Sequence, residues 1–349
     1  MAAVTAVRSL FLDVGVGEAR GVVQLRGRPE RLLIERPGEP AVQKLGARVA
    51  ARVRRIERGL GMAFLDLGEG PDAVVSGQSG VTEGAVLEVE ITAEARAGKG
   101  PVVRVLGPAE GDAPRMLAPG PTLEERLKLL APRVSVTRGP DAREAADEAE
   151  AEALERDYAM PEGGSLAIER TRGLTAVDVD LGARPGGDAK RVSRTANLAA
   201  IVETARLLRL KGLGGLIVMD LAGRGHDGDA LGRAAREAFA ADGPGVSVGP
   251  ISRFGTMELL KPWREQPLGE RLCDPSGRLS PTTVALRLAR ALEREGRASG
   301  GARLLAQAAP EVAAAFEPLR AGLTERLGGR FTIQEDARAE RAHFRVSAQ

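Results

Sequence analysis

Two apolar stretches of the sequence each end in carboxylates. In the first, residues 174–180, Asp178 and Asp180 share one side of a predicted strand, because side chains two positions apart point the same way. The second, residues 214–220, has the continuous apolar character of a buried strand and carries Asp220 at its carboxyl end. If the two strands lie side by side, the three carboxylates converge.

This set of acids favours a hard divalent cation. Carboxylate oxygens without nearby histidine or cysteine suit Mg²⁺, or Mn²⁺ as an alternative. A cation held there would act on a phosphodiester. Isolated strand-end acids more often cap loops, so the acids alone leave a structural role open.

The elements that must position the acids follow from the residues between them. Residues 184–188 form a glycine-rich turn, and the next segment repeats apolar residues at helical spacing, with Ile201, Ala205 and Leu208 on one side. A strand, a turn, a helix and a second strand predict a right-handed crossover in an α/β layer.

Around these acids the chain resembles the ribonuclease E/G family of bacterial endoribonucleases. The resemblance rests on ordered blocks at residues 160–169, 174–180, 186–188, 197–200, 208–220 and 251–255, followed by Glu258, and extends over roughly residues 20–106 and 155–347. It implies a catalytic domain like that of deoxyribonuclease I, in which Asp178 and Asp220 hold Mg²⁺. Asp180 stands where the family commonly has asparagine, and adds a third carboxylate to the predicted catalytic set.

Composition limits the class of protein. The chain has 349 residues, enough for two or three domains, and 50 basic against 48 acidic residues, so RNA affinity must come from a local patch. It contains no apolar run of membrane-spanning length and no signal-peptide core, from which we expect a cytoplasmic protein. The single Cys273 excludes an internal disulfide.

A barrel is predicted before the acids. After an N-terminal β-hairpin region, residues 1–42, residues 43–106 contain five short strand candidates with glycine-rich corners, which is typical of an OB fold. The resemblance implies RNA binding by Phe64, Arg96 and Lys99. A second stacking aromatic of the family falls at about Val74. From the residues alone, Phe64 fits a barrel core equally well, and Arg96 and Lys99 fit a solvated loop.

Residues 107–157 are predicted to form a linker, a short capped helix at 122–130 and an acidic helix at 141–157 that covers a sheet with its charges in solvent. In longer family members this place holds a domain that senses a 5′-monophosphate and an RNase H-like region. About fifty residues cannot contain both. We therefore expect cleavage that is indifferent to the 5′ end of the RNA.

Further candidates lie in the catalytic region, residues 158–270. Arg184 and Arg253 are candidates for holding RNA phosphates, although packing or surface roles suit them as well. His226 is a candidate acid or base, with a solvated loop histidine as the simpler interpretation. A basic residue that the family carries before residues 251–255 is replaced around Gly245.

The last region is residues 271–349. Cys273 matches the first cysteine of the family's zinc link and Ser276 the second, so we expect no structural Zn²⁺, because two subunits would bring only two thiolates. Helices are predicted at 281–295 and 310–327, followed by a closing strand pair at 330–334 and 342–346. We assign this region packing within the chain or formation of a homodimer.

The sequence thus predicts an α/β (α+β) protein with an N-terminal OB-fold β-barrel and a deoxyribonuclease I-like α/β catalytic domain. The predicted function is Mg²⁺-dependent endonuclease hydrolysis of single-stranded RNA in RNA processing or decay, rRNA included. A non-catalytic RNA-binding protein on the same scaffold is the first alternative. A metal phosphoesterase acting on small molecules is the second, although it leaves the barrel without a purpose.

Overall fold

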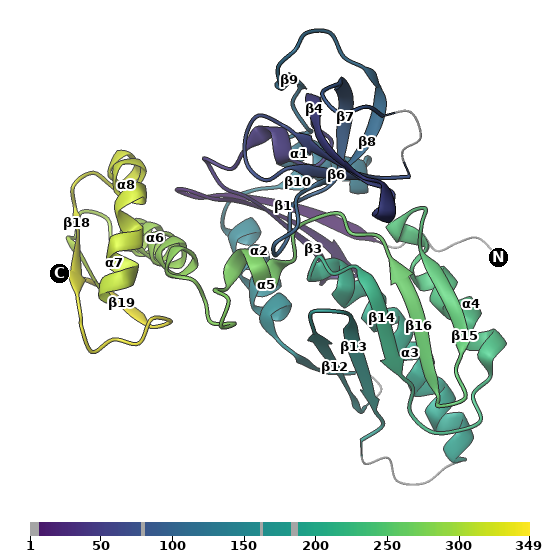
Figure 1. Cartoon of the computed structure of the whole chain (residues 1–349). Helices are drawn as coiled ribbons and strands as arrows, with labels where there is room; N and C mark the ends of the chain where they lie inside the picture. The colour runs from purple at the N-terminus through teal and green to yellow at the C-terminus, as the bar shows by residue number, and fades with distance from the viewer. Residues whose placement is uncertain (1–6, 78–80, 161–162, 183–187) are drawn as a thin grey trace.

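The computed structural model describes residues 7–77, 81–160, 163–182 and 188–349, which form four sheets with helices packed between them (Figure 1). The fold is mixed α/β, with a separate barrel at the top of the view. In this described part of the chain, every helix is too short or too polar to cross a lipid bilayer.

The N-terminal sheet has the strand order β10-β1-β2-β3. Its strands are β1 (Arg8–Val14), β2 (Ala19–Leu25), β3 (Arg28–Glu35) and β10 (Val136–Thr137). Helix α1 (Leu123–Leu130) packs on one face through Leu127, and Gly21 allows this close approach because a Cβ there would lie 3.2 Å from the leucine side chains. Helix α2 (Pro140–Leu154) covers the other face. Val22 and Val23 therefore enter different cores, as strand alternation requires.

The barrel is inserted between β3 and α1. Its strands are β4 (Arg48–Glu57), β5 (Met62–Asp66), β6 (Ala73–Ser76), β7 (Val86–Ala93) and β8 (Val102–Pro108). Pairing in the order β5-β6-β8-β7-β4, with β4 also paired to β5, closes five strands, as expected for an OB-like barrel. Strand β9 (Arg115–Ala118) adds to β4. Residues 107–157 thus supply strands to two sheets as well as the predicted linker and helices.

The acidic helix differs from the solvated helix predicted at 141–157. Helix α2 ends at Leu154, and its buried face carries Glu150, whose carboxylate lies 3.0 Å from Arg20 Nη1 and 2.7 Å from Arg287 Nε. Arg20 belongs to β2, and Arg287 belongs to helix α6 (Pro281–Ala298). The prediction that its charges lie in solvent holds for Asp141, Glu144 and Glu148 but was wrong for Glu150, which is buried. Alanines at helical spacing let the helix pack closely, and arginines from two other elements reach Glu150.

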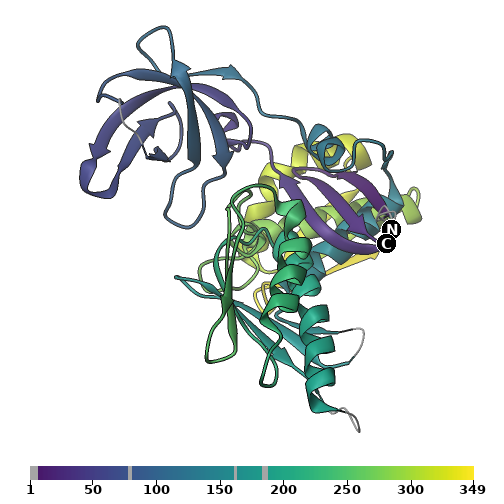
Figure 2. The same ribbon diagram turned by 90° about the vertical axis from the view of Figure 1, so that its right-hand side faces the viewer.

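The sheet of the region predicted to be catalytic has the order β11-β12-β13-β14-β16-β15. Its strands are β11 (Asp157–Ala159), β12 (Ser165–Arg170), β13 (Thr175–Asp180), β14 (Gly215–Asp220), β15 (Ser247–Ile251) and β16 (Thr256–Lys261). Strands β13 and β14 are parallel and joined by helix α3 (Ala189–Leu210), as the predicted crossover requires. Helix α3 and helix α4 (Gly228–Ala238) lie along one face of this sheet (Figure 2). The opposite face exposes Leu216 and Leu260.

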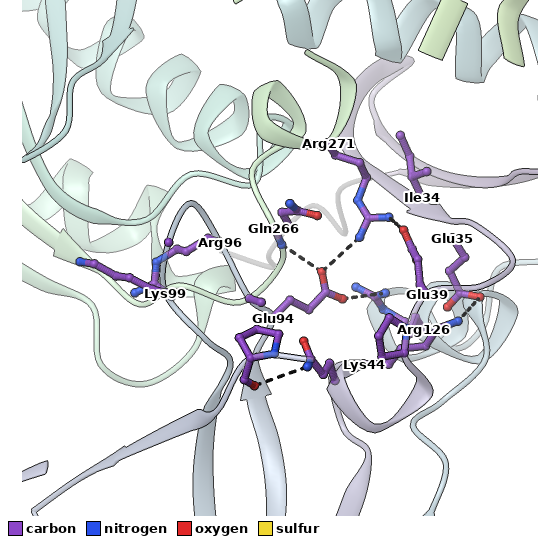
Figure 3. Close-up of a pocket in the computed structure, with 15 residues that line it drawn as sticks. Ile34, Glu35, Glu39, Lys44, Glu94, Arg96, Lys99, Arg126, Gln266 and Arg271 are labelled. Carbon is purple, nitrogen blue, oxygen red and sulfur yellow. Dashed lines mark hydrogen bonds and ion pairs between the residues drawn. The ribbon is translucent and has the colours of Figure 1, made fainter. Parts of the chain in front are cut away.

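The barrel contacts the region predicted to be catalytic at a junction pocket, which has a volume of about 450 Å³ (Figure 3). Glu94, at the end of β7, is the central group. Its carboxylate lies 3.5 Å from Arg126 of α1 and 3.8 Å from Arg271 of helix α5 (Leu268–Leu272). It also accepts a hydrogen bond from the backbone N–H of Gln266 at 3.0 Å. Three parts of the fold thus meet at one carboxylate.

The C-terminal region is a three-stranded sheet beside helices. Strands β17 (Leu304–Ala308), β18 (Phe331–Glu335) and β19 (Phe344–Ala348) follow the order β18-β17-β19, with helices α6, α7 (Pro310–Phe316) and α8 (Arg320–Leu327). The predicted closing pair was wrong, because the two last strands do not pair with each other. Strand β17 lies between them in the sheet. Its five residues show no alternation of apolar and polar side chains that would distinguish a strand from a loop.

Candidate functional site

Asp178 and Asp220 lie side by side. They are directly paired positions on the parallel strands β13 and β14, and both side chains are exposed on the open face of the sheet. Adjacent strands are about 4.8 Å apart. The buried neighbours Val177 and Met219 point to the opposite face, towards the helices. Strand alternation on the two strands therefore presents two carboxylates together to solvent.

Asp180 occupies a different position. It lies on the same face of β13 but beyond the last residue of β14, opposite Ser165 of β12. One of its carboxylate oxygens accepts a hydrogen bond from the Gly182 N–H at 2.8 Å. The expected convergence of three acids is therefore reduced to a pair, with Asp180 partly engaged in the turn that follows its strand.

The acid pair has the chemistry that Mg²⁺ requires. Among the described residues, no group of three or more His, Cys, Asp or Glu side chains is placed to hold a metal ion. Mg²⁺ usually binds through one or two carboxylates and completes its coordination with water and substrate phosphate. Two exposed aspartates in register therefore suit Mg²⁺ better than they suit an ion that needs all of its ligands from the protein.

The loop after Asp220 is held by a residue that sequence reasoning missed. Asn197 on α3 is fully buried, donates its amide N–H to the Ala222 carbonyl at 3.0 Å and accepts from the Ala222 N–H at 3.0 Å. This double hydrogen bond fixes the backbone two residues beyond Asp220. The available signal was an amide on the apolar side of the predicted helix, beside Ala200 and Ile201.

A basic pocket adjoins the carboxyl end of β14, with a volume of about 930 Å³. Arg224, Arg236 and Arg253 line it together with the acidic Asp229. Phe254 is 77% exposed, and the Arg253 guanidinium lies 4.6 Å from its ring centre. The backbone links this pocket to the acids, because the Leu221 N–H donates to the Gly255 carbonyl at 3.3 Å. The pocket thus gathers three arginines near the backbone that follows Asp220.

Two other predicted residues fall around this pocket. His226 lines it, and its Nε2 is shielded from solvent without a hydrogen-bond partner among the described residues. The simpler interpretation as a freely solvated histidine is therefore wrong, since the ring packs against Gly255. Arg184 lies outside the described residues.

Comparison with known proteins assigns this region. Residues 123–263 match the model of the ribonuclease E/G family. Within these residues the chain is similar to ribonucleases of that family. Ribonuclease E of Escherichia coli K12 is 38% identical over 121 residues, which are 34% of this chain and 11% of that protein. Ribonuclease G of the same organism is 29% identical over 177 residues, which are 47% of this chain and 36% of that protein.

The matched region contains both acids and Asn197, while the barrel lies outside it. Ribonuclease E of Haemophilus influenzae is 33% identical over 154 residues, 41% of this chain and 16% of that protein. The chain thus aligns with only 11% to 36% of the length of these relatives.

Phe64 lies on the outer surface of the barrel. It is half-buried, outside the barrel core formed by neighbours such as Ala63 and Leu65, and the Arg55 guanidinium lies 4.5 Å from its ring centre. Val74 is its direct partner on β6. The position where the family has a second aromatic is therefore beside Phe64 on the same face.

Arg96 and Lys99 lie in the turn between β7 and β8, where they form an isolated bridge. Lys99 is exposed. Arg96 instead reaches the catalytic region, with its guanidinium 4.9 Å from the ring centre of Trp263. The structure therefore places Arg96 between the barrel and the sheet that carries the acids.

The segment that resembles the family's zinc link forms a polar turn. Ser276 donates both its N–H and its hydroxyl to the Asp274 carboxylate, at 2.9 and 2.5 Å. Burial raises the pKa of the Cys273 thiol. The absence of a structural zinc ion stays a prediction.

Proposed function

We propose that this chain is a metal-dependent endoribonuclease that hydrolyses single-stranded RNA in RNA processing or decay. The observation that carries this proposal is the in-register pair Asp178 and Asp220 on the open face of a sheet, within the region that matches the ribonuclease E/G family. We further propose that the sheet and its helices form a deoxyribonuclease I-like domain.

The residues divide the work by position. Asp178 and Asp220 would hold Mg²⁺, which when bound supplies positive charge at the scissile phosphate and a more acidic water. Asn197 keeps the strand end and the following loop fixed, so that Asp220 stays opposite Asp178. Arg253 and Arg224 hold RNA phosphates in the adjoining basic pocket. Phe64 stacks on a base and holds the single strand at the barrel.

The test is cleavage of a labelled A/U-rich single-stranded RNA. We expect cleavage with Mg²⁺, none with EDTA, and a loss of at least about a hundredfold in Asp178→Asn and Asp220→Asn, because each change removes one metal-holding charge. Glu237→Gln is the matched control, since Glu237 is an exposed acid on α4 away from the open face. Full activity in both aspartate variants would exclude this site.

A second candidate is a non-catalytic RNA-binding protein. It is favoured by the hydrogen bond from the Gly182 N–H to Asp180, which engages one oxygen of the third acid in the turn after its strand. On this interpretation the chain shifts labelled RNA in a gel in EDTA and leaves it intact in Mg²⁺. Cleavage by wild type that disappears in Asp178→Asn would exclude it.

A further inference from the structure

A large groove separates the barrel from the start of the catalytic strands. It has a volume of about 1010 Å³. One wall is the turn of the β7–β8 hairpin, with Arg96 and Lys99, and the other is the β12–β13 turn, with Arg172. Trp263 and Leu216 lie between them. Figure 2 shows the barrel hairpin reaching down towards the catalytic sheet.

Trp263 forms the floor of this groove. Gly215 begins β14 with φ +83°, and a Cβ there would lie 3.1 Å from the indole Nε1, so glycine lets the ring approach the strand backbone. The guanidinium groups of Arg96 and Arg170 lie 4.9 and 5.3 Å from the ring centre. Flat π systems of this kind stack on bases of any sequence.

The cations of the groove exceed its available acids. Glu270 is engaged by Arg170 and by the Ala97 N–H, the latter at 2.7 Å. Asp274 is engaged by Arg341 and Ser276. In the described part of the chain, no ion pair involves the side chains of Arg96, Lys99 or Arg172. The groove therefore has an excess of positive charge, since Glu270 and Asp274 are outnumbered by the basic side chains of its two walls.

Arg96 shows that this charge is costly without a ligand. Its Nη1 is shielded from solvent and has no hydrogen-bond partner among the described residues. Burial lowers the pKa of Arg96. A shielded donor without an acceptor is unfavourable, and an anion that reaches this atom removes that cost.

The groove also connects two parts of the proposed function. Phe64, Val74 and Val102 are consecutive partners across three strands and therefore share the outer face of the barrel, and Val102 closely follows Lys99. At the other end, Leu216 is 41% exposed on the open face of β14, and Asp220 is four residues further along that strand, about 13 Å away. A single strand leaving Phe64 for the acids meets the groove on its way.

We propose that this Trp263 groove binds the stretch of single-stranded RNA between the barrel and the cleaved phosphodiester, with a base on the Trp263 stack and a phosphate at Arg96. The proposal rests on the proposed function, because it assumes an RNA substrate. Spaced cations around an aromatic floor suit a strand with successive phosphates and bases better than one small anion.

The chain supplies its own reporter for this site, because Trp263 is its single tryptophan. The full-length protein is titrated with a short oligouridylate in EDTA, with tryptophan fluorescence and the anisotropy of labelled RNA recorded in parallel. We expect RNA to change the tryptophan fluorescence and to protect the indole from quenching by acrylamide. Both changes should have the same midpoint RNA concentration as the rise in anisotropy.

Arg172→Ala tests the phosphate contacts without disturbing the barrel, because Arg172 is exposed at a turn tip. We expect affinity to fall several-fold and the slope of log affinity against log salt to decrease by about 0.7, the value for one phosphate of a single strand. Arg345→Ala, an exposed arginine on β19, is the matched control and should bind RNA like wild type.

The outcomes separate the two proposals. RNA that binds by anisotropy while Trp263 keeps its fluorescence and acrylamide access would overturn the groove and leave the nuclease intact. Arg172→Ala that binds RNA with full affinity and an unchanged salt slope would also overturn the groove, even if the fluorescence of Trp263 changes. The fluorescence change would then report a movement of the barrel and not RNA in the groove. Failure of wild type to bind or cleave RNA would overturn the proposed function itself.

Discussion

The side-chain amide of Asn197 forms two hydrogen bonds with the backbone of Ala222, one to the carbonyl and one from the N–H, both at 3.0 Å. Asn197 lies on the long helix α3, and Ala222 lies two residues after Asp220. The helix that connects the two acid-bearing strands thus also fixes the end of the second one. A single buried side chain relates the crossover to the geometry of the acid pair.

Asn197→Ala should damage both stability and cleavage. It removes both hydrogen bonds to the half-buried backbone of Ala222, which costs about 1–3 kcal/mol of unfolding free energy for the two together. Urea unfolding measures this loss. We expect RNA cleavage by the folded fraction to fall at least about tenfold, because the loop after Asp220 is no longer held. Val202→Ala is the control, since Val202 is exposed on the same helix. Normal cleavage by folded Asn197→Ala would contradict a positioning role.

Substitutions at the outer face of the barrel should change RNA affinity in both directions. Phe64→Ala removes a base platform worth about 1–3 kcal/mol, so affinity should fall by about fivefold to a hundredfold. Val74→Phe adds a ring on the directly paired position and should strengthen binding. Anisotropy titrations in EDTA measure both. Leu60→Ala, at another exposed apolar position of the barrel region, should leave affinity unchanged. Equal affinity of Phe64→Ala and wild type would show that RNA does not stack there.

The 5′ end of the RNA should have no effect on the rate. Residues 107–157 contain β9, α1, β10 and α2, all of which pack on the barrel or the N-terminal sheet. We therefore expect equal cleavage rates for one oligonucleotide with a 5′-hydroxyl or a 5′-monophosphate. Both forms are compared at RNA concentrations below saturation, where a difference in binding would also be seen. A strong preference for the monophosphate would refute this prediction.

Acid should loosen the contact between α2 and α6. Burial alone raises the pKa of Glu150, but the charges of Arg290 and Arg287 outweigh it and hold this pKa below its ordinary value of 4.5. A carboxyl with a lowered folded pKa stabilises the protein fully above about pH 4.5, and this contribution is lost as the pH falls through the lowered value. Thermal unfolding recorded from about pH 7 to about pH 3 should show the decline below pH 4.5.

Arg287→Gln should reduce this pH dependence. The Arg287 Nε lies 2.7 Å from the Glu150 carboxylate and its side chain is 31% exposed, so the change should cost only about 1 kcal/mol at neutral pH. Arg297→Gln on the same helix is the control, because Arg297 is exposed. A pH profile of Arg287→Gln that coincides with wild type would mean that this ion pair contributes nothing to the interface.

The sequence by itself determined the local elements around the site. Alternation with a period of two defined β13 and the side shared by Asp178 and Asp180, and the apolar repeat defined α3. The five barrel strands were predicted for the same reason. These features depend on neighbouring residues, so a linear pattern contains them. The ordered family blocks then connected the acids with RNA cleavage.

Only the tertiary structure decided which side chains meet. It paired Asp178 with Asp220, left Asp180 beyond the neighbouring strand, and placed β17 between the two last strands. It also buried Glu150 of α2 and brought Arg96 to Trp263 across 167 positions of sequence, as 263 − 96 gives. Register and charge pairing depend on groups far apart in the chain, and one sequence contains no signal for the partner that a polar side chain will reach.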